Sequence, residues 1–162
     1  MELRLRPLRD EEFPEFLEFL RREYVRGMVE DAGMSREAAE LKATSDHASA
    51  FPGGNRQAHQ RMYLLEDTKT GERAGHLLWA PRQAPGSATE RAYLYEIFID
   101  ERFRWQGLGR QAMELFESQA RDEGLPGIDL NVWGGNERAR GLYLTLGYTE
   151  RAVMMSKELE LE

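Results

Sequence analysis

One turn in the sequence has the residues of an anion-binding site. The apolar run YEIFID ends at Asp100, and the segment from Arg104 to Gly109 (RWQGLG) then leads directly into a helix-like pattern. Several backbone N–H groups at the start of such a helix lack acceptors, and with the helix dipole they attract phosphate oxygens. Gly107 and Gly109 lack the Cβ atoms that would keep a phosphate away from the backbone, and Arg104 can add a charge-assisted contact.

The spacing of this turn differs from that of two common nucleotide-binding motifs. A P-loop needs a Lys-Ser or Lys-Thr pair, and neither pair follows Gly109. A dinucleotide-binding GxGxxG motif needs three glycines early in a βαβ unit, and only two occur here. The residues alone leave two interpretations open, a phosphate-binding loop and a tight strand-to-helix connection without a ligand.

Hydrophobic periodicity predicts the elements that position this turn. Helical spacing predicts helices over 13–28, from a Ser35 cap through Leu41, over 108–120 and, after an Asn136 cap, over 139–146. Strands are expected over 3–6, 62–67, 73–80, 92–100, 128–133 and 149–159, with residues 44–60 as a loop or helix end and 80–90 as a loop. The order β-α-α-β-β-β-α-β-α-β predicts a single α/β domain over residues 1–162, a mixed sheet flanked by helices.

Composition and charge exclude several classes of protein. The 162 residues include no cysteine, which excludes a disulfide scaffold, a thiolate metal site and a cysteine nucleophile. The three histidines show no metal-ligand spacing, so no metal site is predicted. A net charge of −7 disfavours nucleic acid and suits a cationic partner such as an amine. Without a long apolar run or a signal-peptide core, we expect a cytoplasmic protein with no membrane contact.

A second motif follows the glycine turn. The pattern Asn136-x-x-Ala139-x-x-Leu142-Tyr143-x-x-x-Gly147-Tyr148 describes an Asn-capped helix with an internal Leu-Tyr pair and a Gly-aromatic end. With Arg104-x-x-Gly107-x-Gly109 before it and a strand between, it resembles the two signatures of the GNAT superfamily of N-acetyltransferases. The specific resemblance covers about residues 90–150, and the order of elements along the whole chain also matches that fold.

This resemblance implies acetyl-CoA as cosubstrate, bound between the strands at 92–99 and 128–133. In the family, backbone groups of the first strand pair with the pantetheine arm, amides of the turn hold the pyrophosphate, and the capping asparagine contacts the cofactor. The cofactor-binding residues implied for this chain are Ile97, Phe98, Ile99, Arg104, Trp105, Gln106, Gly107, Leu108, Gly109 and Asn136.

The reaction implied is direct transfer of acetyl from a thioester to a primary amine, without a covalent acyl-enzyme. An alkylammonium has a pKa of about 10.4, so a base must take its proton, and the leaving thiolate must be protonated or stabilised. By the family motif Tyr143 lies by the sulfur and is the expected acid, while a backbone N–H of the strand at Ile97–Ile99 donates to the oxyanion. Glu96 is the expected base, with a water chain as the open alternative.

Strand alternation gives the environment expected for Glu96. It places Glu96 with Leu94 and Phe98 on one side of the strand, and Tyr93, Tyr95, Ile97 and Ile99 on the other. Apolar neighbours would leave the carboxyl group poorly solvated and raise its pKa toward a value useful for a base.

The first helix is expected to have an apolar face and a solvated acidic face. The acidic face would comprise Glu15, Glu18, Glu23, Glu30 and Asp31. Because the first helices frame the acceptor site in the family, Tyr24, Glu30 and Asp31 are the residues expected to affect acceptor binding. The sequence does not choose among small amines, amino acids, antibiotics and protein amines as the acceptor.

Three further points stay open at this level. A non-catalytic acyl-CoA-binding sensor or interaction module would keep the glycine turn but would not need Tyr143. An enzyme that uses a longer acyl chain would have the same motifs. Fold analogy also allows a homodimer through the final strand.

Overall fold

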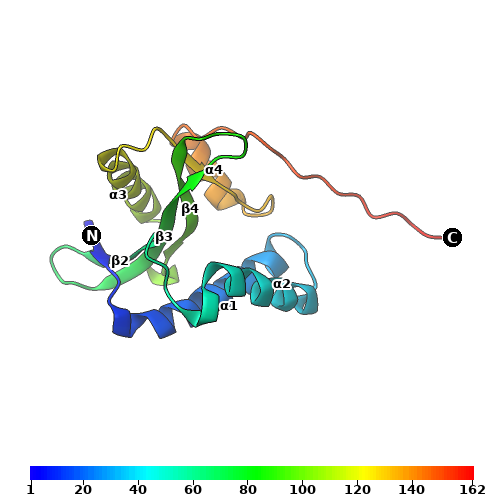
Figure 1. Ribbon diagram of the computed structural model, residues 1–162, viewed down its shortest axis with the longest axis horizontal. Coiled ribbons are helices and arrows are strands. Elements are labelled where there is room, and N and C mark those ends of the chain that lie inside the picture. Colours follow the sequence, from blue (N-terminus) through cyan, green and yellow to red (C-terminus); the bar gives the residue numbers. More distant parts are fainter.

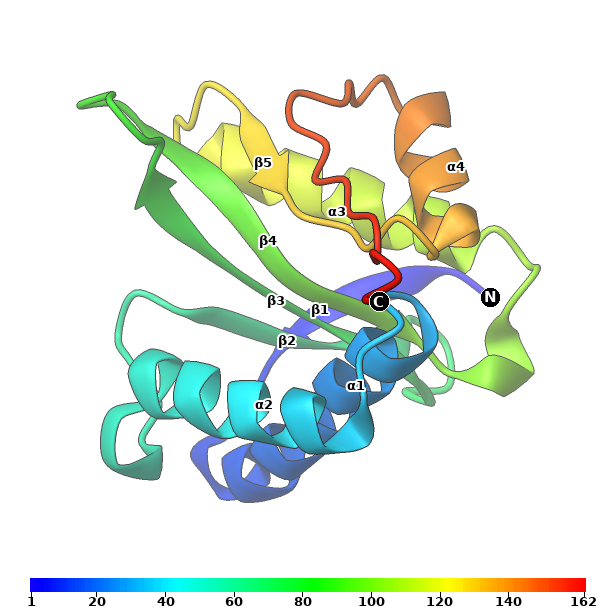
Figure 2. The same ribbon diagram turned by 90° about the vertical axis from the view of Figure 1, so that its right-hand side faces the viewer.

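The computed structural model describes residues 1–162 and shows a sheet with helices on both faces (Figure 1). The strands are β1 (Leu3–Pro7), β2 (Arg61–Asp67), β3 (Arg73–Gln83), β4 (Glu90–Ile99) and β5 (Ile128–Leu130). The α-helices are α1 (Phe13–Glu30), α2 (Arg36–Ala50), α3 (Leu108–Asp122) and α4 (Glu137–Thr145). α1 and α2 lie on one side of the sheet, and α3 and α4 lie on the other (Figures 1 and 2).

The sheet is mixed, and its strands follow the order β1-β2-β3-β4-β5. The first three pairs are antiparallel, while β4 and β5 are parallel because α3 connects them as a crossover helix. This confirms the predicted α/β class and the mixed sheet flanked by helices. None of the helices is both long and apolar enough to cross a membrane.

Two apolar layers hold the helices to the sheet. On one face, Phe16 and Leu20 of α1 pack with Met62, Leu64 and Leu78. On the other face, the α3 and α4 side chains pack on the sheet, and this layer contains the buried residues Leu77, Trp79, Ala92, Leu94, Met113, Phe116, Ala120 and Tyr143. The sheet is therefore covered on both faces, so β4 lies between the two layers of helices.

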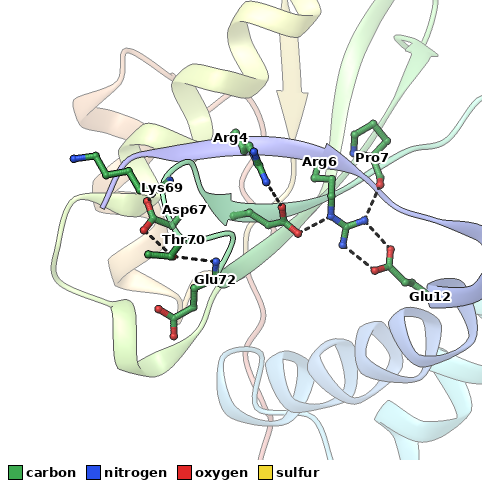
Figure 3. Close-up of polar contacts among 9 residues, drawn as sticks. Arg4, Arg6, Pro7, Glu12, Asp67, Lys69, Thr70 and Glu72 are labelled. Atoms are coloured by element: carbon green, nitrogen blue, oxygen red, sulfur yellow. Dashed lines mark hydrogen bonds and ion pairs between the residues drawn. The ribbon is translucent and has the colours of Figure 1, made fainter.

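An ionic network fixes the entry of α1 against the edge of the sheet (Figure 3). Arg6 of β1 donates to Glu66 of β2 and, through both terminal nitrogens, to Glu12 at 3.0 and 2.8 Å. Arg4 adds a contact of 3.1 Å to Glu66. These contacts hold the pKa of Glu12 at about 2 and lower the pKa of Glu66. The network fixes where α1 starts and hence the path that it takes across the sheet.

The helix end expected within 44–60 lies at Ala50. Three predictions about strands are wrong. β3 continues to Gln83, and β5 ends at Leu130 instead of at residue 133. The strand expected over 149–159 does not form; the chain after Tyr148 has no sheet partner, and its end extends away from the fold (Figure 1). Alternating residues give a strand its two faces, but a strand also needs an edge with which to pair.

Candidate active site

β4 and β5 pair over a short stretch and then leave a free strand edge. Ala92, Tyr93 and Leu94 lie opposite Ile128, Asp129 and Leu130 in parallel register. Residues 96–99 stay paired with β3 but have no partner in β5. An unpaired edge offers backbone N–H and C=O groups to an extended ligand arm. The backbone predicted to bind a cofactor, at Ile97, Phe98 and Ile99, lies along this edge.

A β-bulge at Tyr95 begins this edge and changes which side chains share a face. Leu78 lies opposite Glu96 and Trp79 opposite Leu94, so Tyr95 has no opposite residue in β3. Leu94 therefore packs in the layer under α3, whereas the ring of Phe98 contacts α1. The rings of Tyr93 and Tyr95 lie 4.7 Å apart on the α1 side. The alternation expected from the sequence is wrong for Leu94, Tyr93 and Tyr95, because the extra residue reverses their faces relative to Glu96.

The turn from Arg104 to Gly109 leads into α3, as predicted, with a run of free donors. The backbone N–H groups of residues 105–110 donate to no acceptor of the protein. Gly107, the N-cap of α3, has a φ of 75°, and Trp105 has a φ of 64°. Left-handed residues beside a helix start turn successive N–H groups toward one side, which makes a concavity suited to an anion. Gln106 and Leu108 contribute their backbone to the same turn.

The two glycines of the turn have different roles. Gly107 supplies the left-handed conformation, and the space beside it is open. A Cβ at Gly109 would lie 3.2 Å from Cδ2 of Leu142, so this glycine lets α3 pack closely on α4. Gly109 thus has a role in helix packing, and its expected role in the approach of a phosphate stays a prediction.

Arg138 is a residue of this region that the sequence analysis missed. It lies in the first turn of α4, with its guanidinium 5.3 Å from the ring centre of Trp105. Burial lowers the pKa of Arg138, and the positive charges of Arg104 and Arg26 lower it further. The positive end of a helix disfavours a cation, so a basic residue two positions after the Asn136 cap was a usable signal of an anion site.

Glu96 lies on the α1 face of β4, beside the start of the free edge, and keeps some exposure. Burial of the carboxyl group raises its pKa to about 8; the carboxylate of Glu23 adds to the rise, and Arg26 opposes it. No hydrogen-bond donor of the protein reaches this carboxyl group. The rise in pKa predicted for Glu96 therefore results from the loss of solvation of its carboxyl group.

Tyr143 projects from α4 into the packed layer between the helices and the sheet. It is 9% exposed, and its ring centre lies 5.7 Å from that of Tyr148. Burial raises the pKa of Tyr143 to about 12, with a further contribution from the negative charge of Glu96. The two side chains expected to carry the chemistry thus come from β4 and α4 and lie close enough to interact electrostatically. Asn136 caps α4, as predicted, and accepts from the Ala139 N–H at 3.2 Å.

α1 places two charged residues above Glu96. Nε and Nη2 of Arg26 both donate to Oε2 of Glu23, at 2.9 and 2.8 Å. The Glu23 side chain is 16% exposed, so its expected place on a solvated face is wrong. Its position four residues after Phe19 and three after Leu20 puts it on the stripe that faces the sheet, which the sequence could have indicated.

The three residues expected to affect acceptor binding have different surroundings. The hydroxyl of Tyr24 donates to Asp46 at 2.5 Å, and burial raises the pKa of this tyrosine well above its usual range. Glu30 is paired with Arg26 on the surface at 2.8 Å. The carbonyl of Asp31 accepts from the Gly135 N–H at 3.2 Å, which joins the end of α1 to the loop before α4. Their effect on an acceptor stays a prediction.

Comparisons with known proteins point to the same architecture. The family model described as the acetyltransferase (GNAT) family matches residues 9–148. An uncharacterized N-acetyltransferase of Bacillus subtilis, YycN, is 28% identical over 160 residues, covering 98% of this chain and 100% of that protein. Its crystal structure, a putative acetyltransferase, superposes with a TM-score of 0.87 over 98% of this chain and 99% of that chain.

Two further proteins resemble the chain less closely. The D-amino-acid N-acetyltransferase HPA3 of Saccharomyces cerevisiae is 28% identical over 94 residues, 58% of each protein. AAC(6')-Iy, solved with the bisubstrate analog CoA-S-monomethyl-acetylneamine, shares the fold with a TM-score of 0.59 and 13% identity. The alignment covers 98% of this chain and 100% of that one.

Proposed function

The chain belongs to the acetyltransferase (GNAT) family and is an acyltransferase, and we propose that it moves an acetyl group directly from acetyl-CoA to a primary amine. One observation carries this proposal: Glu96, beside the free edge of β4, is close enough to Tyr143 of α4 to affect its pKa, and the same strand leads on to the anion-binding turn. A carboxyl group and a phenol in one place supply the base and the acid that amine acetylation needs.

The residues of this chain fit acetyl-CoA as the donor. The free N–H groups of residues 105–110, with Arg104 and Arg138, suit the charge of a pyrophosphate. The unpaired edge at Ile97–Ile99 suits the amide groups of a pantetheine arm. Acetyl-CoA supplies an activated acetyl group as a thioester, and Asn136 lies at the start of α4 next to Arg138.

Glu96 takes the proton that the acceptor must lose. The amine nitrogen bonds to the carbonyl carbon of the thioester, the carbon–sulfur bond breaks, and the products are an N-acetylated amine and CoA. A base with a pKa of about 8 is close to the optimum for work near neutral pH. Because the ionised form of Glu96 is the base, kcat/KM should rise as the pH increases through about 8.

Tyr143 is the acid in this proposal. A pKa of about 12 keeps its phenol protonated throughout the working range, so it can give its proton to the leaving thiolate. A backbone N–H of the strand at Ile97–Ile99 would stabilise the oxyanion. The reaction needs no acyl-enzyme, and the chain has no cysteine to form a thioester.

The test is release of CoA from acetyl-CoA with a panel of amines, detected with a thiol reagent. The protein contributes no thiol, so the background is low. Release should depend on the amine and fall about 100-fold in Tyr143→Phe, the scale of a lost general acid. Tyr148→Phe is the matched control, since that part-buried hydroxyl donates to Glu117 at 3.2 Å and Glu96 does not affect its pKa.

Three results would contradict parts of the proposal. Tight binding of acetyl-CoA without CoA release for any amine would favour a sensor of acyl-CoA. Absence of acetyl-CoA binding would exclude the assignment of the turn at Arg104–Gly109. Equal loss of turnover in the Tyr143 and Tyr148 variants would remove the acid role from Tyr143.

A further inference from the structure

The α1 helix brings a second carboxyl group to the site, and it has no role in the reaction described above. We infer that Glu23 and Glu96 form a paired-carboxylate subsite that binds the acceptor as an alkylammonium ion. The inference rests on the proposed function, because it names the charge state in which the acceptor arrives at that same site.

The packing of α1 on β4 places the two carboxyl groups opposite each other. The rings of Phe19 in α1 and Phe98 in β4 lie 4.9 Å apart. The step of four residues from Phe19 to Glu23 covers about 6 Å along α1, and the step of two residues from Phe98 to Glu96 covers about 6.6 Å along β4. Each step keeps the side chain on the same face of its element, so Glu23 lies over Glu96. The electrostatic effect of Glu23 on Glu96 agrees with this placement.

The next turn of α1 continues over the gap beside β4. The position of a Cβ at Gly27 lies 3.6 Å from Cδ1 of Trp133, in the chain that follows β5. Glu23 therefore lies between a contact with β4 at Phe19 and a contact with the β5 side at Gly27. This is the stretch where β4 is paired with β3 but has no partner in β5, so the two carboxyl groups lie beside the free edge along which the donor would bind.

Three carboxylate oxygens in this subsite have no donor. Both donor groups that Arg26 directs to Glu23 end at Oε2, and its Nη1 goes to Glu30, so Oε1 of Glu23 is free. Both oxygens of Glu96 also lack a donor. An ammonium group has three N–H donors and no acceptor. Its hydrogen-bonding capacity therefore matches the free oxygens of the pair.

The charge balance also favours a cation. Arg26 is shared between Glu23 and Glu30, so it leaves the carboxyl group of Glu96 without a cation of its own. Two neighbouring carboxylates resist simultaneous ionisation, and a bound cation relieves this repulsion. Tyr143, whose pKa the charge of Glu96 raises, is a neutral phenol and brings no positive charge. An arriving ammonium ion would thus favour ionisation of Glu96, the form that then accepts its proton.

The test compares two acceptors that differ in charge. A simple alkylamine is a cation at neutral pH, whereas aniline is neutral, and both can be acetylated on nitrogen. In Glu23→Gln the KM for the alkylamine should rise about tenfold, the scale of a lost hydrogen bond to a charged group, while the KM for aniline stays unchanged. Glu18→Gln is the matched control, because Glu18 is an exposed residue of the same helix and should change neither KM.

A direct binding measurement separates this inference from the proposed function. Calorimetric titration of the protein–CoA complex with the alkylammonium ion should show binding that weakens about tenfold in Glu23→Gln. If no amine yields CoA in the unmodified protein but this binding behaves as expected, the proposed reaction fails and the cation subsite stands. Equal effects of Glu23→Gln on both acceptors, or no effect on either, would overturn the subsite while leaving the acetyltransferase activity in place.

Discussion

Glu96, which is partly buried, and His76, which is fully buried, are titratable residues on the same side of neighbouring strands, and they differ in what surrounds them. In the register of β3 and β4, His76 lies opposite Phe98, two residues from Glu96, and both side chains lie under α1. Burial favours the neutral form of each, raising the pKa of Glu96 to about 8 and lowering that of His76 to about 3.

His76 is sealed off, whereas Glu96 is not. The imidazole is fully buried, neither ring nitrogen has a partner, and the rings of Phe16, Phe19 and Phe98 all lie within 5.4 Å of it between ring centres. Glu96 keeps some exposure and interacts with Glu23, Arg26 and Tyr143. A shifted pKa is thus common to both residues, and only Glu96 also has the charged neighbours and the partial exposure that transfer of a proton requires.

The pairing of the strands around β4 explains why His76 is fully buried and Glu96, a few residues away, is not. At Gly75 a Cβ would lie 1.9 Å from the Phe98 carbonyl oxygen, so β3 and β4 are in close contact at the His76 end. At Tyr95 the bulge interrupts the register, and beyond Leu94 the pairing with β5 stops. β4 is therefore in close contact with β3 near His76, whereas near Glu96 its other edge has no partner.

The largest expected effect comes from Glu96→Gln, which removes the proposed base and keeps the shape of the side chain. The kcat/KM for acetyl transfer should fall about 10²- to 10⁴-fold, the contribution of general base catalysis. His76→Leu replaces the imidazole with a side chain of similar volume and should leave kcat/KM within about twofold. A substitution in the core, away from the reacting groups, changes the free energy of unfolding more than the rate of acetyl transfer. Steady-state kinetics of CoA release measures both. If the two variants lose activity to the same degree, the contrast between the two residues is wrong.

The sequence predicted the frame of this site and one of its two acidic residues. Periodicity predicted the helices that carry Tyr143 and Glu23, and the two motifs predicted the turn at Gly107. The bulge at Tyr95 was not predictable, because AYLYEIFI alternates without a break and the extra residue follows from pairing with β3. Glu23 was misplaced because acidic residues are usually solvated, although its spacing from Phe19 puts it on the apolar stripe.

The second expected effect is on stability at high pH. The pKa of Glu96 rises from its ordinary 4.5 to about 8 on folding, so the folded protein holds a proton that the unfolded chain has lost. Stability from this residue is complete below about pH 4.5 and is lost as the pH rises through about 8, by a few kcal/mol. In Glu96→Gln this slope should vanish. Urea unfolding at pH 5, 7 and 9 measures it, and an unchanged slope would place the carboxyl group in water.

The smallest expected effect has the opposite sign and belongs to His76. Its pKa falls from 6.5 to about 3 on folding, so the unfolded chain binds the extra proton between these values. Stability from neutral His76 is present above pH 6.5 and is lost as the pH falls toward 3. His76→Leu should flatten this acid limb and, by removing two unpartnered nitrogens, add about 1–3 kcal/mol at neutral pH.

The same urea series, extended to pH 3, tests both residues, because their slopes have opposite signs and cover different pH ranges. His76→Leu should stabilise the protein throughout, with a gain that grows as the pH falls below 6.5, whereas Glu96→Gln should remove the loss of stability between about pH 4.5 and 8. A destabilised His76→Leu protein would mean that the imidazole nitrogens have partners and that its ring contacts are worth more than its desolvation costs. The core residue would then resemble Glu96 in having a polar role, and burial without partners would no longer distinguish the two places.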